Sequence, residues 1–567
     1  LPLSFLCGRE SSIAGVFHIP AGVFFLSMPF AMTRRCALAA PLLFLALAAE
    51  PHPPLLGEIA AAMGDGGPAY ERDSVAGLPK IEAGLAPLLP TLPRGEAGRF
   101  EGPAVRYALY HFFVREYGWR INGLDPMGDA WNSSSPSEAA ALKRMPEGVR
   151  ELLAKRLDEE GLDEQGLAVL AWTLRYLIQD ETEARLRVAY GLLRFPVDAP
   201  VKPAEAELAL NMHAASHVAS MDLATTPAKK VLAVYKKMDK IYPAWNETQA
   251  FIHEAFESER RAAGAAAGAG VSFDESRSVL SRITERYGLW QDRECRDMKA
   301  MLLPWEDHGS GRVHLTDFYR ASLSGRWQFS ESTEYLRRLG ALDETVPSSP
   351  RVIIVNYLLS YSNCVGSTAY NDLCCVSECE ALMAAVERHV ASSSATPDGL
   401  LEVVADLPSS TVPAGRQLGP LLEQRLRWIA AQHDGAVPIY GRLFAQWMHH
   451  AYPRECPYPH AVGTTQQLSP LDYARTTGAN RTASEAEMQG VVARPERRDH
   501  PQETVPWDPR EEVLAPPTRT PVGFAALHFA VTAVAMCLLL ASLGGVTARR
   551  RRTNKAGQVP SSPQIPV

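Results

Sequence analysis

Apolar residues recur at helical spacing through most of the chain, and alternating strand patterns are rare. Residues 105–117 are apolar and aromatic almost all round, which predicts a buried helix that ends at Gly118. Repeats at i, i+3 and i+4 predict further helices over residues 146–157, 167–178, 204–221, 227–241, 248–263, 273–301, 378–390, 421–430 and 441–450. The pattern therefore predicts a mainly α fold.

The most apolar stretch is residues 522–546, where His528 is the only strongly polar member. About 20 apolar residues in a helix cross a bilayer, so this run predicts one transmembrane helix. Arg549 to Arg552 follow it, and the positive-inside rule then places the tail, residues 547–567, in the cytoplasm. Everything before the helix is expected to face away from the cytosol.

The N-terminal part of the chain agrees with that orientation. Two arginines, Arg34 and Arg35, precede an apolar stretch at 36–47 and a small-residue cleavage pattern at Ala46 to Ala48. This order predicts a signal peptide over residues 32–49, with residues 1–31 as upstream or leader sequence. The expected product is a type I single-pass protein of the plasma membrane or an endomembrane, whose head is lumenal or extracellular.

Composition shifts divide the head into segments. Prolines at 51, 53, 54, 87, 90 and 93 predict an irregular segment over residues 50–100, and the Ala/Gly run at 262–270 predicts a linker. We therefore expect one helical domain at 101–265 and a second at 271–461. Residues 462–521 are rich in Pro, Thr, Glu and Arg without apolar periodicity, which predicts a disordered stalk.

Composition and charge narrow the class of protein. The chain has 567 residues, of which 46% are hydrophobic and 21% charged, values typical of a globular protein. Its formal net charge of −7 argues against nucleic acid as a partner, because phosphate binding needs clustered Lys and Arg.

The cysteines predict disulfides. Cys7 and Cys36 fall in the leader and Cys537 in the membrane, which leaves an even set in an oxidising compartment: Cys295, Cys364, Cys374, Cys375, Cys379 and Cys456. All fifteen pairings that six cysteines allow stay open. Adjacent Cys374 and Cys375 should bond to different partners and fix a loop at the start of the helix expected at 378–390. Sequons at Asn132, Asn246 and Asn480 lie on the same side of the membrane, as expected of a glycoprotein.

Residues 304–318, PWEDHGSGRVHLTDF, resemble the calcium loop of an EF-hand. Gly311 takes the position where the loop turns sharply, and Val313 would pair with a second loop. The candidate metal ligands on this register are Glu306, His308, Ser310, Arg312 and Asp317, with His314 at the ninth position.

Histidines at two loop positions and an Asp in place of the final Glu reduce the number of oxygen ligands. We therefore expect weak Ca²⁺ binding, with dissociation constants of roughly 10⁻⁴ to 10⁻³ M. The alternative is a helix-loop-helix that only packs. A second loop at 432–441 aligns Gly435 and Val437 with the first but has almost no ligands, so it is either a non-binding partner or an unrelated turn.

Histidines suggest a different chemistry. His213 and His217 lie one helical turn apart, and His449, His450 and His460 lie near Cys456. The alternative is that they are ordinary core or surface histidines. The sequence shows no GxSxG, HExxH, phosphate-loop, dinucleotide or kinase motif.

Four blocks of sequence resemble large membrane-anchored ectodomain proteins of algal protists, whose activity is not characterised. The blocks are HFFVREYGWRINGLDPMGDAWN at 111–132, NYLLSYSNCVGSTAYNDLCCVSECE at 356–380, LPSSTV at 407–412 and GRLFAQWMHHAYPRECPYPHAVGT at 441–464. The resemblance implies an exported, disulfide-bonded head with an EF-hand label, and it implies no activity.

Two functional hypotheses follow. The first is a membrane-anchored head that binds Ca²⁺ weakly and interacts with another protein or the cell surface. The alternative is a lumenal metal-dependent enzyme that uses His213, His217 and the C-terminal histidines. Because no catalytic motif is present, the first is favoured over enzymatic activity.

Overall fold

The computed structural model describes residues 54–95, 97–125, 139–266, 268–325, 328–494, 507–512 and 514. The leader, signal peptide, transmembrane helix (522–546) and cytoplasmic tail expected from the sequence lie outside these residues, as does the sequon residue Asn132. Within the described ranges, no helix is both long enough and apolar enough to cross a membrane.

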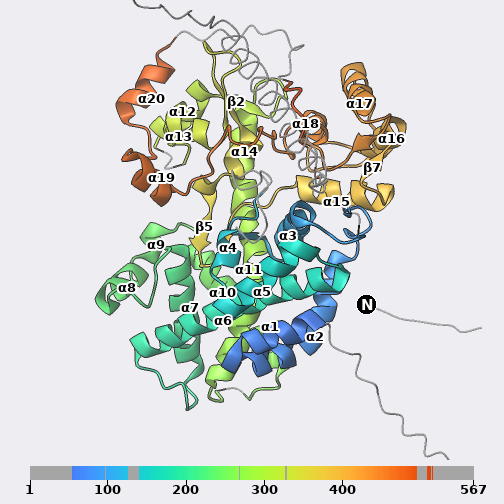
Figure 1. Ribbon diagram of the computed structural model, residues 1–567. Coiled ribbons are helices and arrows are strands. Elements are labelled where there is room, and N and C mark those ends of the chain that lie inside the picture. The colour runs from blue at the N-terminus through green and yellow to red at the C-terminus, as the bar shows by residue number, and fades with distance from the viewer. Residues whose placement is uncertain are drawn as a thin grey trace, which may run out of the picture. The chain divides into compact units, whose positions relative to one another are not determined.

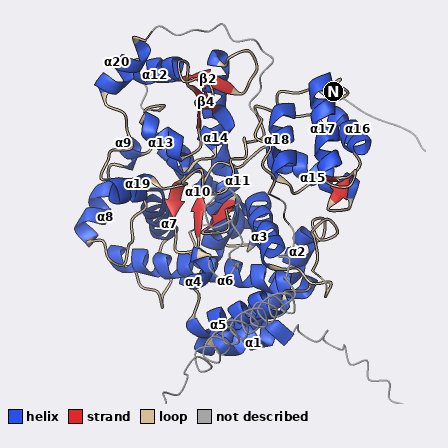
Figure 2. Cartoon of the chain, turned by 45° about the horizontal axis from the view of Figure 1, so that its top comes forward, coloured by secondary structure: helices blue, strands red, loops and turns tan. Residues whose placement is uncertain are grey.

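The fold is mainly α, as predicted (Figures 1 and 2). The helices before the Ala/Gly run are α1 (Pro54–Ala62), α2 (Gly67–Leu85), α3 (Gly102–Tyr117), α4 (Ala140–Lys143), α5 (Glu147–Lys155), α6 (Glu164–Leu193), α7 (Pro203–Val218), α8 (Ala228–Tyr235), α9 (Met238–Ile241) and α10 (Trp245–Ala262). Those after it are α11 (Phe273–Leu302), α12 (Leu315–Leu323), α13 (Thr333–Arg338), α14 (Ile354–Leu358), α15 (Cys379–Val390), α16 (Pro397–Asp406), α17 (Pro420–Gln432), α18 (Arg442–Ala451), α19 (Pro470–Thr477) and α20 (Glu485–Val492).

Short antiparallel strands join segments that are far apart in the sequence. They are β1 (Trp119–Ile121), β2 (Arg312–His314), β3 (Leu342–Asp343), β4 (Arg351–Ile353), β5 (Val365–Ser367), β6 (Asn371–Leu373), β7 (Ser394–Ala395) and β8 (Val437–Pro438). Their orders are β1-β6-β5, β2-β4-β3 and β7-β8. Strands of two or three residues are too short to show an alternating pattern, so sequence periodicity does not reveal them.

Helix α11 runs through the middle of the described structure and contacts α3, α6, α7, α10 and α14 (Figure 1). Its start is set by a capping box, in which the Ser272 hydroxyl accepts from the Glu275 amide and the Glu275 carboxylate accepts from the Ser272 amide. Gly118 ends α3 with φ +67° and lies against Gly288 in α11. A β-carbon at either glycine would collide with the other backbone, so this close crossing requires both.

Two hydrophobic cores organise the described residues. The larger core takes side chains from α1 to α7 and α10, and also from α15 to α18, so it extends across the Ala/Gly run at 262–270. The smaller core lies around the EF-hand-like segment and includes Val313, Phe318, Tyr335, Tyr473 and Met488. The helices on both sides of this run, α10 and α11, therefore contribute to one shared core.

Two segments are more ordered than the sequence predicted. The segment at 50–100 contains α1 and α2. Pro54 and Pro68 do not prevent these helices, since they occupy the first turns, where proline is tolerated. The expected stalk forms α19 and α20 over part of its length. Tyr473 and Met488 are buried in the smaller core, and Val491 and Val492 pack against it. These few apolar positions give no clear periodic signal.

All six cysteines of the head form disulfides, as predicted: Cys295–Cys375, Cys364–Cys374 and Cys379–Cys456. Cys374 and Cys375 bond to different partners and precede α15, which confirms the expected loop. The bridges join α11 to this loop and α15 to the turn after α18.

Candidate functional site

The EF-hand-like segment lies between α11 and α12, with the short helix η5 (Leu303–Trp305) and β2 inside it. The Glu306 carboxylate accepts a hydrogen bond of 2.6 Å from the Gly311 amide, and Gly311 adopts φ +71°. The Pro453 carbonyl lies so close to Gly311 that a side chain there would collide with it. The glycine therefore serves a tight turn and a close backbone contact at once.

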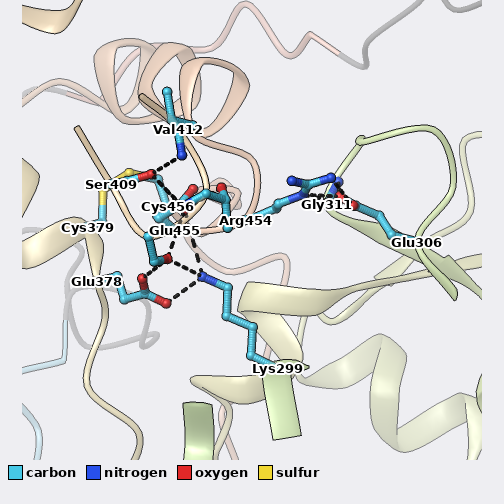
Figure 3. Close-up of polar contacts among 12 residues, drawn as sticks. Lys299, Glu306, Gly311, Glu378, Cys379, Ser409, Val412, Arg454, Glu455 and Cys456 are labelled. Carbon is cyan, nitrogen blue, oxygen red and sulfur yellow. Dashed lines mark hydrogen bonds and ion pairs between the residues drawn. A yellow bond between two sulfur atoms is a disulfide. The ribbon is translucent and has the colours of Figure 1, made fainter. Parts of the chain in front are cut away.

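Glu306 binds an internal cation. Arg454 donates from Nε to both Glu306 carboxylate oxygens, at 3.0 and 2.8 Å, and its Nη2 lies 2.5 Å from Oε2 (Figure 3). The Glu306 side chain is only 3% exposed. A carboxylate buried to this degree needs a partner, and the guanidinium supplies it.

The other four candidate ligands have separate surroundings. His308 is exposed, Arg312 is buried and donates to Asp343 at 2.7 Å, and Asp317 pairs with Arg320. The Ser310 hydroxyl is buried without a hydrogen-bond partner. In the described part of the chain, no group of three or more His, Cys, Asp or Glu side chains is placed to hold a metal ion. Calcium binding by these residues stays a prediction.

Of the two alternatives for the loop at 432–441, a partner loop or an unrelated turn, the strand pairing fits the unrelated turn. Val313 in β2 pairs with Val352 of β4, whereas Val437 in β8 pairs with Ala395 of β7. The loop at 432–441 therefore belongs to the β7-β8 sheet. Val313 thus pairs with a strand only about 40 residues further along the chain, and not with the loop at 432–441.

A buried network of charges and hydroxyls lies next to Arg454 (Figure 3). Lys299 at the end of α11 lies 2.5 Å from Glu378 and 3.9 Å from Glu455, whose side chain is fully buried. Glu455 also accepts from Ser409 at 2.9 Å and from Thr411 at 2.6 Å. The network thus ties α11, the loop before α15, the loop at 409–411 and the turn after α18 to one another.

A cavity with a volume of about 230 Å³ lies beside this network. Its walls come from α3, the disulfide-bonded loop at 374–377, α15, α18 and the turn at 456–460. Ala445 in α18 lines the cavity and is also exposed, which marks the mouth. Largely apolar cavities with a few convergent polar groups are the usual form of small-molecule sites.

Charged side chains in the cavity wall pair with protein groups. Glu380 accepts from His111 at 2.6 Å and from Arg115 at 3.0 Å. Burial raises the pKa of Glu380, but His111 and Arg115 lower it by more, to about 2. Arg120 pairs with Asp125 and donates to the Leu359 carbonyl at 3.0 Å. Arg442 donates to three backbone carbonyls, those of Pro459, Asp508 and Arg510.

The structure does not bring the two sets of histidines together. His213 and His217 line a separate cavity of about 50 Å³, together with Trp119 and Tyr287. His460, by contrast, lines the larger cavity and donates from Nε2 to the Gly340 carbonyl, while His449 donates from Nδ1 to the Cys456 carbonyl. A metal site shared by both sets, as the enzyme hypothesis requires, has no support in this arrangement.

The cavity residues were missed as a site by sequence reasoning. Tyr107, Tyr110 and His111 were assigned only to a buried helix, although their i, i+3 and i+4 spacing puts three polar rings on one side of it. Three of the four blocks that carry the family resemblance also contribute to the cavity wall. Polar aromatic residues in an otherwise apolar helix were the available signal.

The Glu306–Arg454 pair can be tested by a double-mutant cycle. Arg454→Met should lower the free energy of unfolding by about 2–4 kcal/mol, because it leaves the buried Glu306 carboxylate without its cation. Glu306→Gln combined with Arg454→Met should recover much of that loss in urea denaturation. Arg320→Met, which removes an exposed partner of Asp317, should cost less than about 1 kcal/mol. Equal losses in the single and double variants would contradict the pairing.

Acid should destabilise the fold through its buried histidines. Burial lowers the pKa of His213 and of His449 well below the ordinary value, with Arg185 and Arg312 as further causes. Below about pH 6.5 the unfolded chain therefore binds protons that the folded protein excludes, and stability falls by about 1.4 kcal/mol per pH unit for each histidine. Urea denaturation at pH 7.5 and 5.5 should show this loss. His449→Asn should make the free energy of unfolding depend less steeply on pH, by the equivalent of about one bound proton. The exposed His308→Asn is the control, and identical stability at both pH values would contradict the prediction.

In comparisons with protein-family models, curated proteins and solved structures, no match was found.

Proposed function

We propose that this chain is a type I single-pass membrane protein with a lumenal or extracellular head, and that the head binds a small organic molecule in the cavity beside Lys299 and Glu455. The membrane part of the proposal rests on the apolar run at 522–546 and the basic residues that follow it. Three disulfides fit an oxidising compartment. A protein partner for the head stays a prediction from the sequence.

The cavity is the observation that carries the binding function. It combines about 230 Å³ of space, a mouth at Ala445 and walls from several elements that disulfides hold together. The cysteines in the wall are all disulfide-bonded, so they offer no thiol for catalysis. Paired charges and bonded cysteines favour binding over nucleophilic catalysis.

Calcium binding by the loop at 306–317 is a second proposal. It is supported by the turn at Gly311, which has the conformation that the sixth position of such a loop requires. Arg454 would have to release Glu306 for the ion to enter. Titration calorimetry should show Ca²⁺ heat at millimolar concentration that Asp317→Ala abolishes. The absence of heat, or heat that Asp317→Ala leaves unchanged, would count against the proposal.

The binding function can be tested with 4-fluorotoluene, an uncharged apolar probe small enough for the cavity. Binding to the full chain in lipid nanodiscs would be followed by ¹⁹F NMR, with empty nanodiscs as the blank. Ala445→Trp should weaken binding at least about tenfold, because the indole fills the mouth. Ala474→Trp, on an exposed face of α19 outside the cavity wall, should have no effect. If the probe does not bind, or binds equally to both variants, the cavity is not the site.

A further inference from the structure

One wall of the cavity is built from aromatic rings. The ring centroids of Tyr440 and Tyr107 lie 4.5 Å apart, those of Tyr107 and His111 lie 3.9 Å apart, and those of Tyr110 and His111 lie 5.1 Å apart. Aromatic rings attract further rings in offset or edge-to-face contacts, worth about 0.5–1.5 kcal/mol beyond the area they bury. This wall therefore favours a flat aromatic ligand over an aliphatic one of equal size.

Two hydroxyl-bearing side chains, Ser377 and Tyr110, line the wall. The Ser377 hydroxyl is buried and makes no hydrogen bond within the described part of the chain. Burial raises the pKa of Tyr110 well above its ordinary value, so the Tyr110 hydroxyl stays protonated and can donate. A buried hydroxyl left unpaired in an apolar wall favours a ligand that supplies a donor or acceptor.

Most charged groups of the wall already have protein partners. Arg120 is paired with Asp125, Glu380 with His111 and Arg115, and Arg442 with backbone carbonyls and with Asp508 at 3.5 Å. Glu512 accepts from the Val462 amide at 3.0 Å. An ion that enters this cavity would lose its hydration and would have to compete with these partners for a counter-charge, at a cost of several kcal/mol. The charge pairing therefore selects against carboxylates and ammonium ions.

The volume limits the size of the ligand. An apolar cavity of about 150 Å³ holds one benzene molecule. At about 230 Å³, this cavity has space for a single ring with a few substituents. Long acyl chains exceed it.

From these four features, which rest on the proposed function, we infer that the cavity takes an uncharged, hydroxyl-bearing aromatic ring, the chemistry of a substituted phenol. The ring would lie against Tyr107 and Tyr440, and its hydroxyl would exchange hydrogen bonds with Tyr110 and Ser377. The disulfide bonds of Cys374 and Cys375 hold the loop that carries Ser377 in place.

The inference can be tested with four probes that share one fluorinated ring. The affinities of 4-fluorophenol, 4-fluorotoluene, 4-fluorobenzoate and 4-fluorobenzylammonium for the full chain would be measured by ¹⁹F NMR at pH 7.5. We expect 4-fluorophenol to bind about threefold to tenfold more tightly than 4-fluorotoluene, and the two ions to bind at least about tenfold more weakly than 4-fluorophenol. Tyr110→Phe combined with Ser377→Ala should remove the preference for the phenol, so that 4-fluorophenol and 4-fluorotoluene bind with equal affinity. Tyr70→Phe, which removes a hydroxyl bonded to Thr173 elsewhere in the core, is the control.

The outcomes separate this inference from the proposed function. If neither uncharged probe binds, the proposed function fails. If both uncharged probes bind equally, or if an ion binds as tightly as the phenol, the cavity is a ligand site but the inferred ligand class is wrong. If the double variant no longer binds 4-fluorotoluene, the two hydroxyls stabilise the cavity wall and do not select the ligand by hydrogen bonding.

Discussion

The turn after α18 is the constraint on which the rest of the described structure depends. Three consecutive residues in it each hold a different segment: Arg454 binds Glu306, Glu455 accepts from the loop at 409–411, and Cys456 is bonded to Cys379 at the start of α15 (Figure 3). One short turn therefore joins the EF-hand-like segment and both sides of the cavity. Because all three contacts are buried or partly buried, loss of any one of them leaves a charge, an acceptor or a thiol without its partner.

This arrangement explains how a largely apolar cavity can stay open. Side chains in a protein interior normally collapse until voids are filled. Here α15 is held by the Cys379–Cys456 bridge, and α3 is held against α15 by the ion pairs of Arg115 with Glu380 and Glu387. Fixed walls reduce the conformational entropy that a ligand must overcome, which is the physical advantage of a preformed site.

The sequence predicted the helices that carry strong local signals. Helix α3 ends at Gly118 as expected, and α11 begins at a Ser272–Glu275 capping box. The sequence also predicted that Cys374 and Cys375 bond to different partners. Helices α19 and α20 were missed although Ser469 and Ser484 cap them, because few apolar residues stand in this polar segment. Secondary structure was therefore most predictable where apolar periodicity is strong, and a cap alone was not enough.

The candidate site was less predictable, since its contacts are long-range. Glu306 looked like a calcium ligand because its local sequence suits one, but its partner Arg454 lies 148 positions away. The cavity is assembled from helices that no spacing rule connects.

Ligand binding in the cavity is tested most directly by hydrogen-exchange mass spectrometry of the full chain with and without 4-fluorophenol. Binding in the cavity should slow amide exchange in α3, α15 and α18 and leave α7, beside the His213 cavity, unchanged. Protection in α7 alone, or in none of these helices, would contradict it.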